Sequence, residues 1–161
     1  QIFLESSLFF SGMRPAVNVG LSVSRVGGDA QTKAMKKAAG SLRIDLAQYR
    51  EMEVFTQFSS DLDDATKEQL EYGSGLMELL KQPLGKPMSL AEKVITLCAA
   101  RHKVMLGIPT AKVKGFQMDM LSYFASAHPE IAREIEETKD LSKELSQKIV
   151  EIAEEFKKSR C

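Results

Sequence analysis

Arg25 follows a segment in which apolar residues alternate with small polar ones. In residues 17–24, valine or leucine occupies every second position, which is the pattern of a strand with one apolar face. Gly27 and Gly28 then permit a tight exit loop. Ligands of open α/β sheets bind at the carboxyl ends of strands, and a guanidinium group matches phosphate oxygens well. The pattern therefore predicts that Arg25 senses phosphate at a sheet rim, with a solvated arginine as the alternative.

Other residues of types that serve catalysis or metal binding lie too far apart to predict a reactive centre. Ser22 and Ser24 have no base nearby in the sequence, which gives little support for nucleophilic catalysis. His102 and His128 are isolated from each other. The eight methionines do not cluster with cysteine or histidine, so we interpret them as core and interface residues. We expect no metal site in these 161 residues.

Two kinds of element are predicted to position these residues. Residues 1–28 are expected to form the last strands of a sheet, with strands at 2–4 and 17–24 and a turn around 11–15. From Asp29 onward, apolar and small residues recur at helical spacing, which predicts a helical bundle over residues 30–161. The first expected helix runs from Asp29 to about Met52, with a weak point at Gly40. The second runs from a cap at Asp61 or Asp63 to Pro83, and the third from a capping box at Ser89 to about Met105. Three more are expected over 113–124, for a short distance from Pro129, and over 141–156.

The composition is that of a globular protein with one ordinary core. The 161 residues are 43% hydrophobic and 27% charged, and 22 basic residues balance 22 acidic ones. A formal net charge of zero gives no electrostatic case for nucleic acid as a partner. The basic cluster Lys33, Lys36, Lys37 and Arg43 is interpreted as a solvated helical face, since residues 51–80 hold eight acidic residues and a single lysine.

Neither a disulfide framework nor a membrane anchor is predicted. Cys98 and Cys161 are far apart and lack metal-binding spacing, so we expect reduced thiols in a reducing compartment. No apolar run approaches the roughly 18–20 residues of a membrane-spanning helix, and no signal peptide is visible. Membrane association is therefore expected only through partners.

The first half of the sequence carries a dense resemblance to a known family. The motif Gly-Leu-Ser-Val-Ser-Arg at 20–25 closely resembles the arginine-finger segment of the F-type ATP synthase alpha subunit family. After about Pro87, the resemblance rests on helix pattern and composition. Four further segments extend the match in the first half, namely 1–5, 40–51, 57–63 and 78–82.

The resemblance implies a fold class and a division into domains. In the family, the polypeptide before this point carries a β-barrel and most of a RecA-like domain, including a glycine-rich phosphate loop that has no counterpart in this sequence. We therefore expect a C-terminal piece of a larger polypeptide. Its fold is expected to be mainly α, with terminal strands of a RecA-like α/β nucleotide-binding domain over 1–29 and a C-terminal helical domain over 30–161.

The same resemblance implies roles for individual residues. Arg25 is expected to reach across a subunit interface to the terminal phosphates of a nucleotide held by a catalytic beta subunit. Arg14, Gln82 and Ser24 are expected to bind nucleotide, with Arg14 and Gln82 on its base and ribose side. Ordinary alternatives are a turn residue for Arg14 and a helix end for Gln82. Leu84 departs from the family, which usually has a second glutamine there.

Activity and partners are likewise implied by the resemblance. We expect ATP synthesis or hydrolysis coupled to proton or sodium-ion transport, with ATP or ADP and Mg²⁺ bound mainly outside these residues. The expected partners are beta subunits in an alternating hexamer and a gamma rotor subunit, which the turn at 58–63 would face, at the periphery of an energy-coupling membrane. The isolated polypeptide is expected to be inactive. The alternative is a stand-alone helical protein-interaction module without catalysis.

Overall fold

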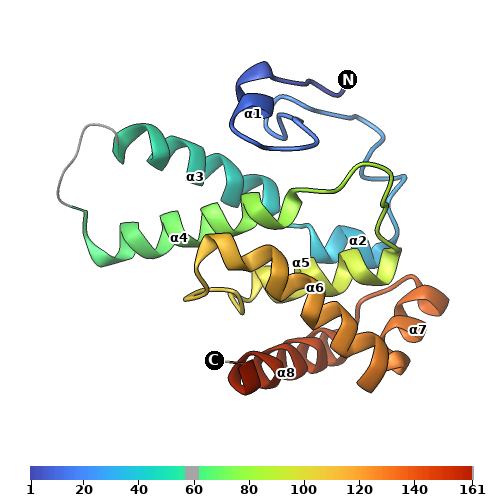
Figure 1. Ribbon diagram of the computed structural model, residues 1–161. Coiled ribbons are helices and arrows are strands. Elements are labelled where there is room, and N and C mark those ends of the chain that lie inside the picture. The colour runs from blue at the N-terminus through green and yellow to red at the C-terminus, as the bar shows by residue number, and fades with distance from the viewer. Residues whose placement is uncertain (57–61, 161) are drawn as a thin grey trace.

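The computed structural model describes residues 1–56 and 62–160, and every regular element in these residues is a helix (Figure 1). The mainly α fold class is therefore confirmed. The helices are α1 (Ser6–Phe10), α2 (Lys33–Ala38), α3 (Leu42–Thr56), α4 (Asp64–Leu80), α5 (Leu90–Arg101), α6 (Thr110–Ala127), α7 (Pro129–Thr138) and α8 (Lys143–Arg160).

Three of the predicted helix starts, at Asp63, Ser89 and Pro129, are confirmed by local side-chain features. Asp63 accepts a hydrogen bond from the Thr66 N–H at 2.7 Å at the start of α4, whereas Asp61 lies outside the described residues. Ser89 and Glu92 form a complete capping box at the start of α5. Pro129 is the first residue of α7. Local side-chain chemistry thus fixes where these helices begin.

Two helices end earlier than the periodicity predicts. The long helix expected from Asp29 is divided at the weak point around Gly40, since α2 ends at Ala38 and α3 begins at Leu42. The helix expected to reach Met105 ends at Arg101. Lys103 follows with a positive φ of 59°, and Gly107 has a φ of 83°. These two conformations turn the backbone toward α6.

The strands expected in residues 1–28 do not form. In the described residues this segment contains α1 and a single antiparallel bridge between Leu4 and Val17. Farther along, residues 21–24 share only one backbone-to-backbone hydrogen bond with residues 1–5, from the Gln1 amino group to the Val23 carbonyl at 3.5 Å, and the Phe3 N–H donates instead to the Ser22 side-chain oxygen at 3.0 Å. A strand needs neighbours for its backbone N–H and C=O groups, and alternation alone does not supply them.

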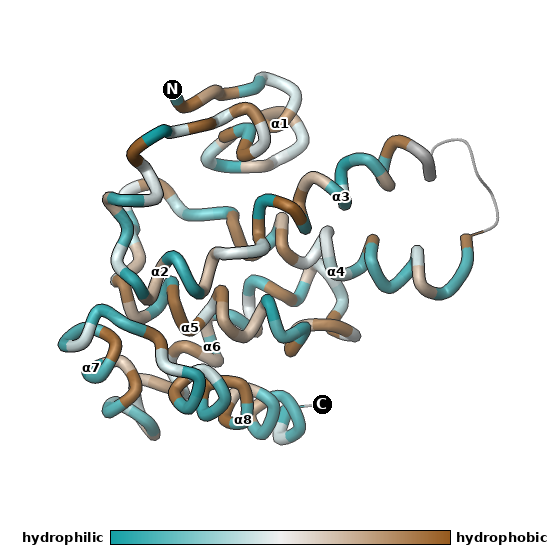
Figure 2. The backbone as a smooth tube through the Cα atoms, turned by 180° about the vertical axis from the view of Figure 1, so that it is seen from behind, coloured by the Kyte–Doolittle hydropathy of each residue, from teal (hydrophilic) through white to brown (hydrophobic). Residues whose placement is uncertain are grey.

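α5 is the centre of the bundle. It packs against α2, α6, α7 and α8, and its residues Val94 and Ala99 are completely buried. Hydrophobic and hydrophilic residues alternate along the turns of α8, as Figure 2 shows by colour. The core also contains Phe124 from α6 and Ile149 from α8. Burial of these side chains in one contiguous cluster provides the main driving force for folding.

α3 and α4 form a helical hairpin that extends to one side of the bundle (Figures 1 and 2). The two helices approach closely at Gly73, where an added Cβ atom would lie only 2.3 Å from the Tyr49 ring. Gly73 is therefore needed for the contact between the two helices, which accounts for a glycine inside α4. In the same contact, burial together with the nearby Glu53 carboxylate raises the pKa of Tyr49 to about 12.

Candidate functional site

Arg25 lies in an exposed loop rather than at the end of a strand. Its side chain forms no hydrogen bond or ion pair with any of the described residues. Leu21 and Val23, which were expected on the apolar face of a strand, are 57% and 60% exposed, whereas Val19 packs partly against the core. The guanidinium group therefore keeps all its N–H donors available for a ligand or partner.

The turn after Arg25 is tight and depends on Gly27. A Cβ atom at Gly27 would lie 2.8 Å from Ser24 Cβ, which is closer than carbon atoms pack. The N–H groups of Asp29 and Ala30 both donate to the Val26 carbonyl at 3.0 Å. This turn fixes the backbone beside Arg25. The tight exit loop predicted from the two glycines is therefore present, with Gly27 as the residue that it requires.

Arg14 and Gln82, two of the residues expected to bind nucleotide, lie next to each other. The Gln82 N–H donates to the Arg14 carbonyl at 2.8 Å, immediately after the C-terminal end of α4. The Arg14 guanidinium lies 4.6 Å from the centroid of the Phe9 ring, in cation–π geometry. The Gln82 side chain makes no hydrogen bond with the described residues, so its amide remains free to bind a ligand.

Residues 3–20 are held by a small polar network that sequence reasoning missed. Asn18 is buried, and its side-chain N–H donates to Glu5 Oε1 at 2.6 Å while its Oδ1 accepts from the Leu21 N–H. The Asn18 N–H donates to the Phe3 carbonyl at 2.8 Å. Arg43 of α3 donates to the Gly20 carbonyl at 3.3 Å. Asn18 thus links the bridge region to the loop that leads toward Arg25.

The described contacts do not join Arg25 and Ser24 to Arg14 and Gln82. Ser24 is exposed and lies against Gly27. The predicted site residues therefore form two separate positions in this structure. One is the exposed loop of Arg25 and Ser24, and the other is the Arg14–Gln82 contact.

A groove of about 370 Å³ lies beside Gln82 and continues along α6. Lys114 of α6 lines it and donates to the Leu79 carbonyl at 3.3 Å and to the Lys81 carbonyl. Burial lowers the pKa of Lys114, although Glu78 acts in the opposite direction. A cation beside the last carbonyls of α4 complements the helix dipole. The helical spacing of the sequence around Lys114 does not predict this role.

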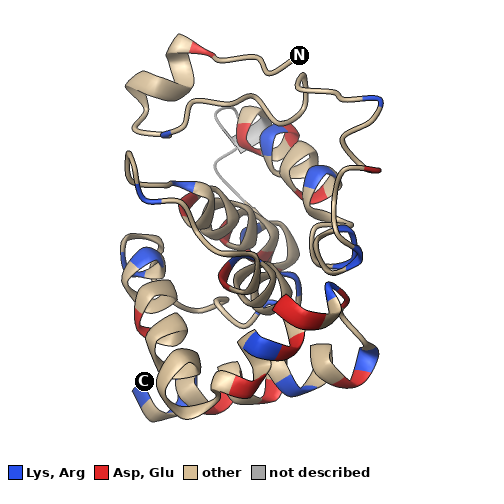
Figure 3. Cartoon of the chain, turned by 90° about the vertical axis from the view of Figure 1, so that its right-hand side faces the viewer, with Lys and Arg blue, Asp and Glu red and all other residues tan. Residues whose placement is uncertain are grey.

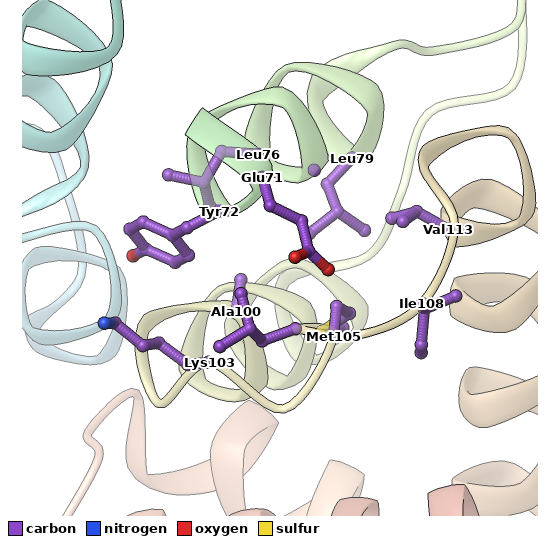
Figure 4. Close-up of a pocket in the computed structure, with 11 residues that line it drawn as sticks. Glu71, Tyr72, Leu76, Leu79, Ala100, Lys103, Met105, Ile108 and Val113 are labelled. Carbon is purple, nitrogen blue, oxygen red and sulfur yellow. The ribbon is translucent and has the colours of Figure 1, made fainter. Parts of the chain in front are cut away.

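A second cavity, between α4 and the turn after α5, is a packing feature (Figure 4). Its volume of about 10 Å³ is the lower limit for one water molecule. Glu71 Oε1 accepts the Gly107 N–H at 2.6 Å, and Lys103 pairs with Glu68 at 2.7 Å. Burial and the Asp45 carboxylate raise the pKa of Tyr72 to about 12. These contacts fasten the turn to α4.

Neither a metal cluster nor a membrane-spanning helix is found in the described part of the protein. Within 1–56 and 62–160, no group of three or more His, Cys, Asp or Glu side chains is arranged to hold a metal ion. No helix in these ranges is both long and apolar enough to span a bilayer. The predicted turn at 58–63 lies mostly outside the described residues.

Comparison with known proteins identifies relatives along nearly the whole sequence. Residues 31–156 match the family described as ATP synthase alpha/beta chain, C terminal domain. The sequence is 53% identical over 158 residues to the ATP synthase subunit alpha of Clostridium kluyveri, covering 98% of this protein and 31% of that one. It is 51% identical over 156 residues to the Petrotoga mobilis subunit, covering 97% and 31%, and 50% identical over 158 residues to the Mycolicibacterium smegmatis subunit, covering 98% and 29%. The 161 residues thus span less than a third of these relatives' length.

Proposed function

Because the protein belongs to the family formed by the C-terminal domains of ATP synthase alpha and beta subunits, we propose that it acts as part of the alpha subunit of a rotary F-type ATP synthase. Residues 1–29 would complete a nucleotide-binding domain, and residues 30–161 would form the helical domain. The activity proposed for the assembly is synthesis or hydrolysis of ATP coupled to proton or sodium-ion transport. The isolated polypeptide would be inactive because its sequence has no phosphate loop.

The contact between Arg14 and Gln82 is the observation that carries this proposal. The two residues are distant in the sequence and were expected at the base and ribose side of a bound nucleotide. Their 2.8 Å backbone hydrogen bond puts them at one position while the Gln82 amide remains free. Such an amide can donate to and accept from a purine edge. We propose that Arg14 and Gln82 bind that end of the nucleotide, and that Ser24 makes its nucleotide contact at the separate position beside Arg25.

Arg25 is proposed as an arginine finger that acts on a neighbouring subunit. Its exposed guanidinium has no partner among the described residues, which leaves it available for an interface. A guanidinium contributed in trans stabilises the charge that develops on the phosphoryl group during transfer, an effect of about 10³ to 10⁵ in rate. We propose beta subunits of an alternating hexamer as the partners that hold the catalytic nucleotide and Mg²⁺, with a gamma subunit as rotor and a peripheral position on the energy-coupling membrane.

The test is the steady-state rate of ATP hydrolysis by the assembled complex of this alpha-type subunit with beta and gamma subunits. Arg25→Ala is expected to lower turnover by about 10³ or more while nucleotide binding persists. Arg133→Ala is the matched control, because Arg133 is an exposed arginine on α7 whose side chain makes no hydrogen bond or ion pair with the described residues. Parent-like turnover of the Arg25→Ala complex would contradict the proposal and favour a helical interaction module.

A further inference from the structure

A groove between α5, the start of α8 and the end of α2 is lined by basic residues, and no carboxylate of the described residues lines it. Its volume is about 580 Å³. The protein as a whole has equal numbers of acidic and basic residues, so this local imbalance does not follow from composition. The lining residues are Lys37, Arg101, His102, Leu141, Ser142, Lys143, Ser146, Gln147 and Val150. We propose that the groove binds an oxyanion of the phosphate class, a role outside the nucleotide contacts proposed above.

The basic side chains retain donors that the fold does not use. Arg101 donates one N–H to the Lys37 carbonyl at 2.6 Å, which leaves four others. The side chains of Lys143 and His102 make no hydrogen bond or ion pair with the described residues. Arg101 and Lys143 are cationic donors, and the His102 ring adds an N–H donor. The groove therefore favours a ligand that carries several acceptor oxygens.

Two carboxylates bind lining residues without lining the groove themselves, and both are already engaged. Asp140 pairs with Lys37 at 2.7 Å and accepts the Leu141 N–H at the same distance. Glu151 accepts from Gln147 at 3.0 Å. Hydrogen bonding to Lys37 is the main cause that lowers the pKa of Asp140. The positive charge of Arg101 and Lys143 therefore has no compensating carboxylate in the described contacts.

The groove is also lined by two serine hydroxyl groups. Ser142 Oγ accepts the Leu145 N–H at 3.0 Å as α8 begins, so its own hydrogen is free to donate. Ser146 Oγ lies 3.2 Å from the buried Cys98 thiol, which fixes that side chain against α5. The free Ser142 hydroxyl, in the same groove as Arg101 and Lys143, adds a hydrogen bond that a phosphate oxygen can accept, and a cleft with charge of one sign concentrates counter-ions.

The experiment is a titration of the 161-residue protein with inorganic phosphate at low salt, followed by NMR and calorimetry. Saturable shifts are expected at residues 101–102 and 142–147, and binding should weaken as sodium chloride is added. Lys143→Gln and Arg101→Gln are each expected to weaken binding by about tenfold, the usual loss for one charge-assisted hydrogen bond. Lys158→Gln, at the far end of α8, is the matched control and should bind like the parent.

Three results would overturn the proposal. The first is the absence of saturable shifts in a parent protein whose helical circular dichroism is intact. The second is an equal loss of binding in Lys158→Gln and Lys143→Gln, which would indicate general charge screening. The third is binding to phosphatidic acid vesicles, but not to phosphatidylcholine vesicles, by a protein that does not bind soluble phosphate. That result would indicate contact with a membrane surface instead of a phosphate site in the groove.

Discussion

The N-terminal segment 1–28 and the bundle of α5–α8 differ in how far their apolar side chains are buried. In the bundle, Ile131 and Ile149 are completely buried. In the segment, Ile2 is 76% exposed and Phe10 is 84% exposed. Figure 1 shows the segment lying over the upper side of the helices, outside their core. The bundle therefore covers its own apolar residues, whereas several of those in the segment stay exposed although Met13 is buried and Val19 packs partly against the core, as expected if 1–29 belong to a domain that other residues complete.

Charged side chains are concentrated in the helices, whereas residues 1–28 contain only Glu5, Arg14 and Arg25. Lysines and arginines are interspersed with acidic residues along the helices (Figure 3). Most ion pairs in the described residues are exposed and contribute little to stability. Because these exposed ion pairs contribute little, apolar packing is the difference between the regions that should govern stability, and mutations can test it directly.

The largest expected effect on stability comes from removing a core ring. Phe124→Ala should lower the free energy of unfolding by about 3–5 kcal/mol, because Phe124 is only 2% exposed and its loss leaves a cavity. Phe10→Ala, in the segment, should change it by less than about 0.5 kcal/mol. Urea unfolding followed by circular dichroism measures both. Similar losses from the two substitutions would break the distinction between the regions.

A smaller loss is expected at the close contact between α3 and α4. Gly73→Ala would drive a Cβ atom into the Tyr49 ring and should cost about 1–3 kcal/mol of unfolding free energy. Gly75→Ala has open space around its Cβ position and should be neutral or stabilising, since alanine favours a helix. Thermal unfolding of the pair compares them. If Gly73→Ala proved as stable as Gly75→Ala, the close packing of the hairpin would be refuted.

Loss of a cap should cost less again. Ser89→Ala removes the acceptor for the Glu92 N–H and should lower the unfolding free energy by about 1 kcal/mol. Ser126→Ala, within α6, removes a hydroxyl that bonds only its own helix and serves as control. Amide hydrogen exchange should be faster at the start of α5 in Ser89→Ala alone. Unchanged exchange there would mean that packing, not the cap, holds this end.

The smallest effect concerns pH. Hydrogen bonding from Lys139, and then from the Ala91 N–H, lowers the pKa of Glu136 below its ordinary 4.5. A carboxyl with a depressed pKa in the folded state adds stability above its unfolded pKa and loses it as the pH falls through the folded value. The parent should therefore lose stability below about pH 4.5, and Glu136→Gln should lose less. Identical acid unfolding curves would exclude a role for Glu136.

The bundle was predictable from the sequence because its signals are local. Asp63 and Ser89 begin helices by accepting a hydrogen bond from a residue three positions later. Pro129 begins one because its ring fixes φ near the helical value. The alternation at 17–24 predicted strands that did not form, since a strand depends on backbone partners elsewhere. The helical spacing from Asp29 also failed to mark the start of α2 at Lys33.

The candidate site could be predicted only in part. Arg14 and Gln82 were paired through family resemblance, and no local pattern relates them. Lys114 was missed because its role depends on the Leu79 and Lys81 carbonyls, which are distant in sequence. Asn18 was interpreted as one of the small residues in the alternation, although it is buried and hydrogen-bonded. Tertiary contacts of this kind leave no periodic signal.

The most direct test of the arginine-finger proposal is a structure of the assembled alpha–beta complex with a non-hydrolysable ATP analogue and Mg²⁺. We expect the Arg25 guanidinium to lie within about 3 Å of a terminal phosphate oxygen of the nucleotide on the neighbouring subunit. We also expect the exposed apolar side chains of residues 1–28 to be covered in that complex. An Arg25 side chain that remains in solvent, with the nucleotide bound elsewhere, would contradict the proposal.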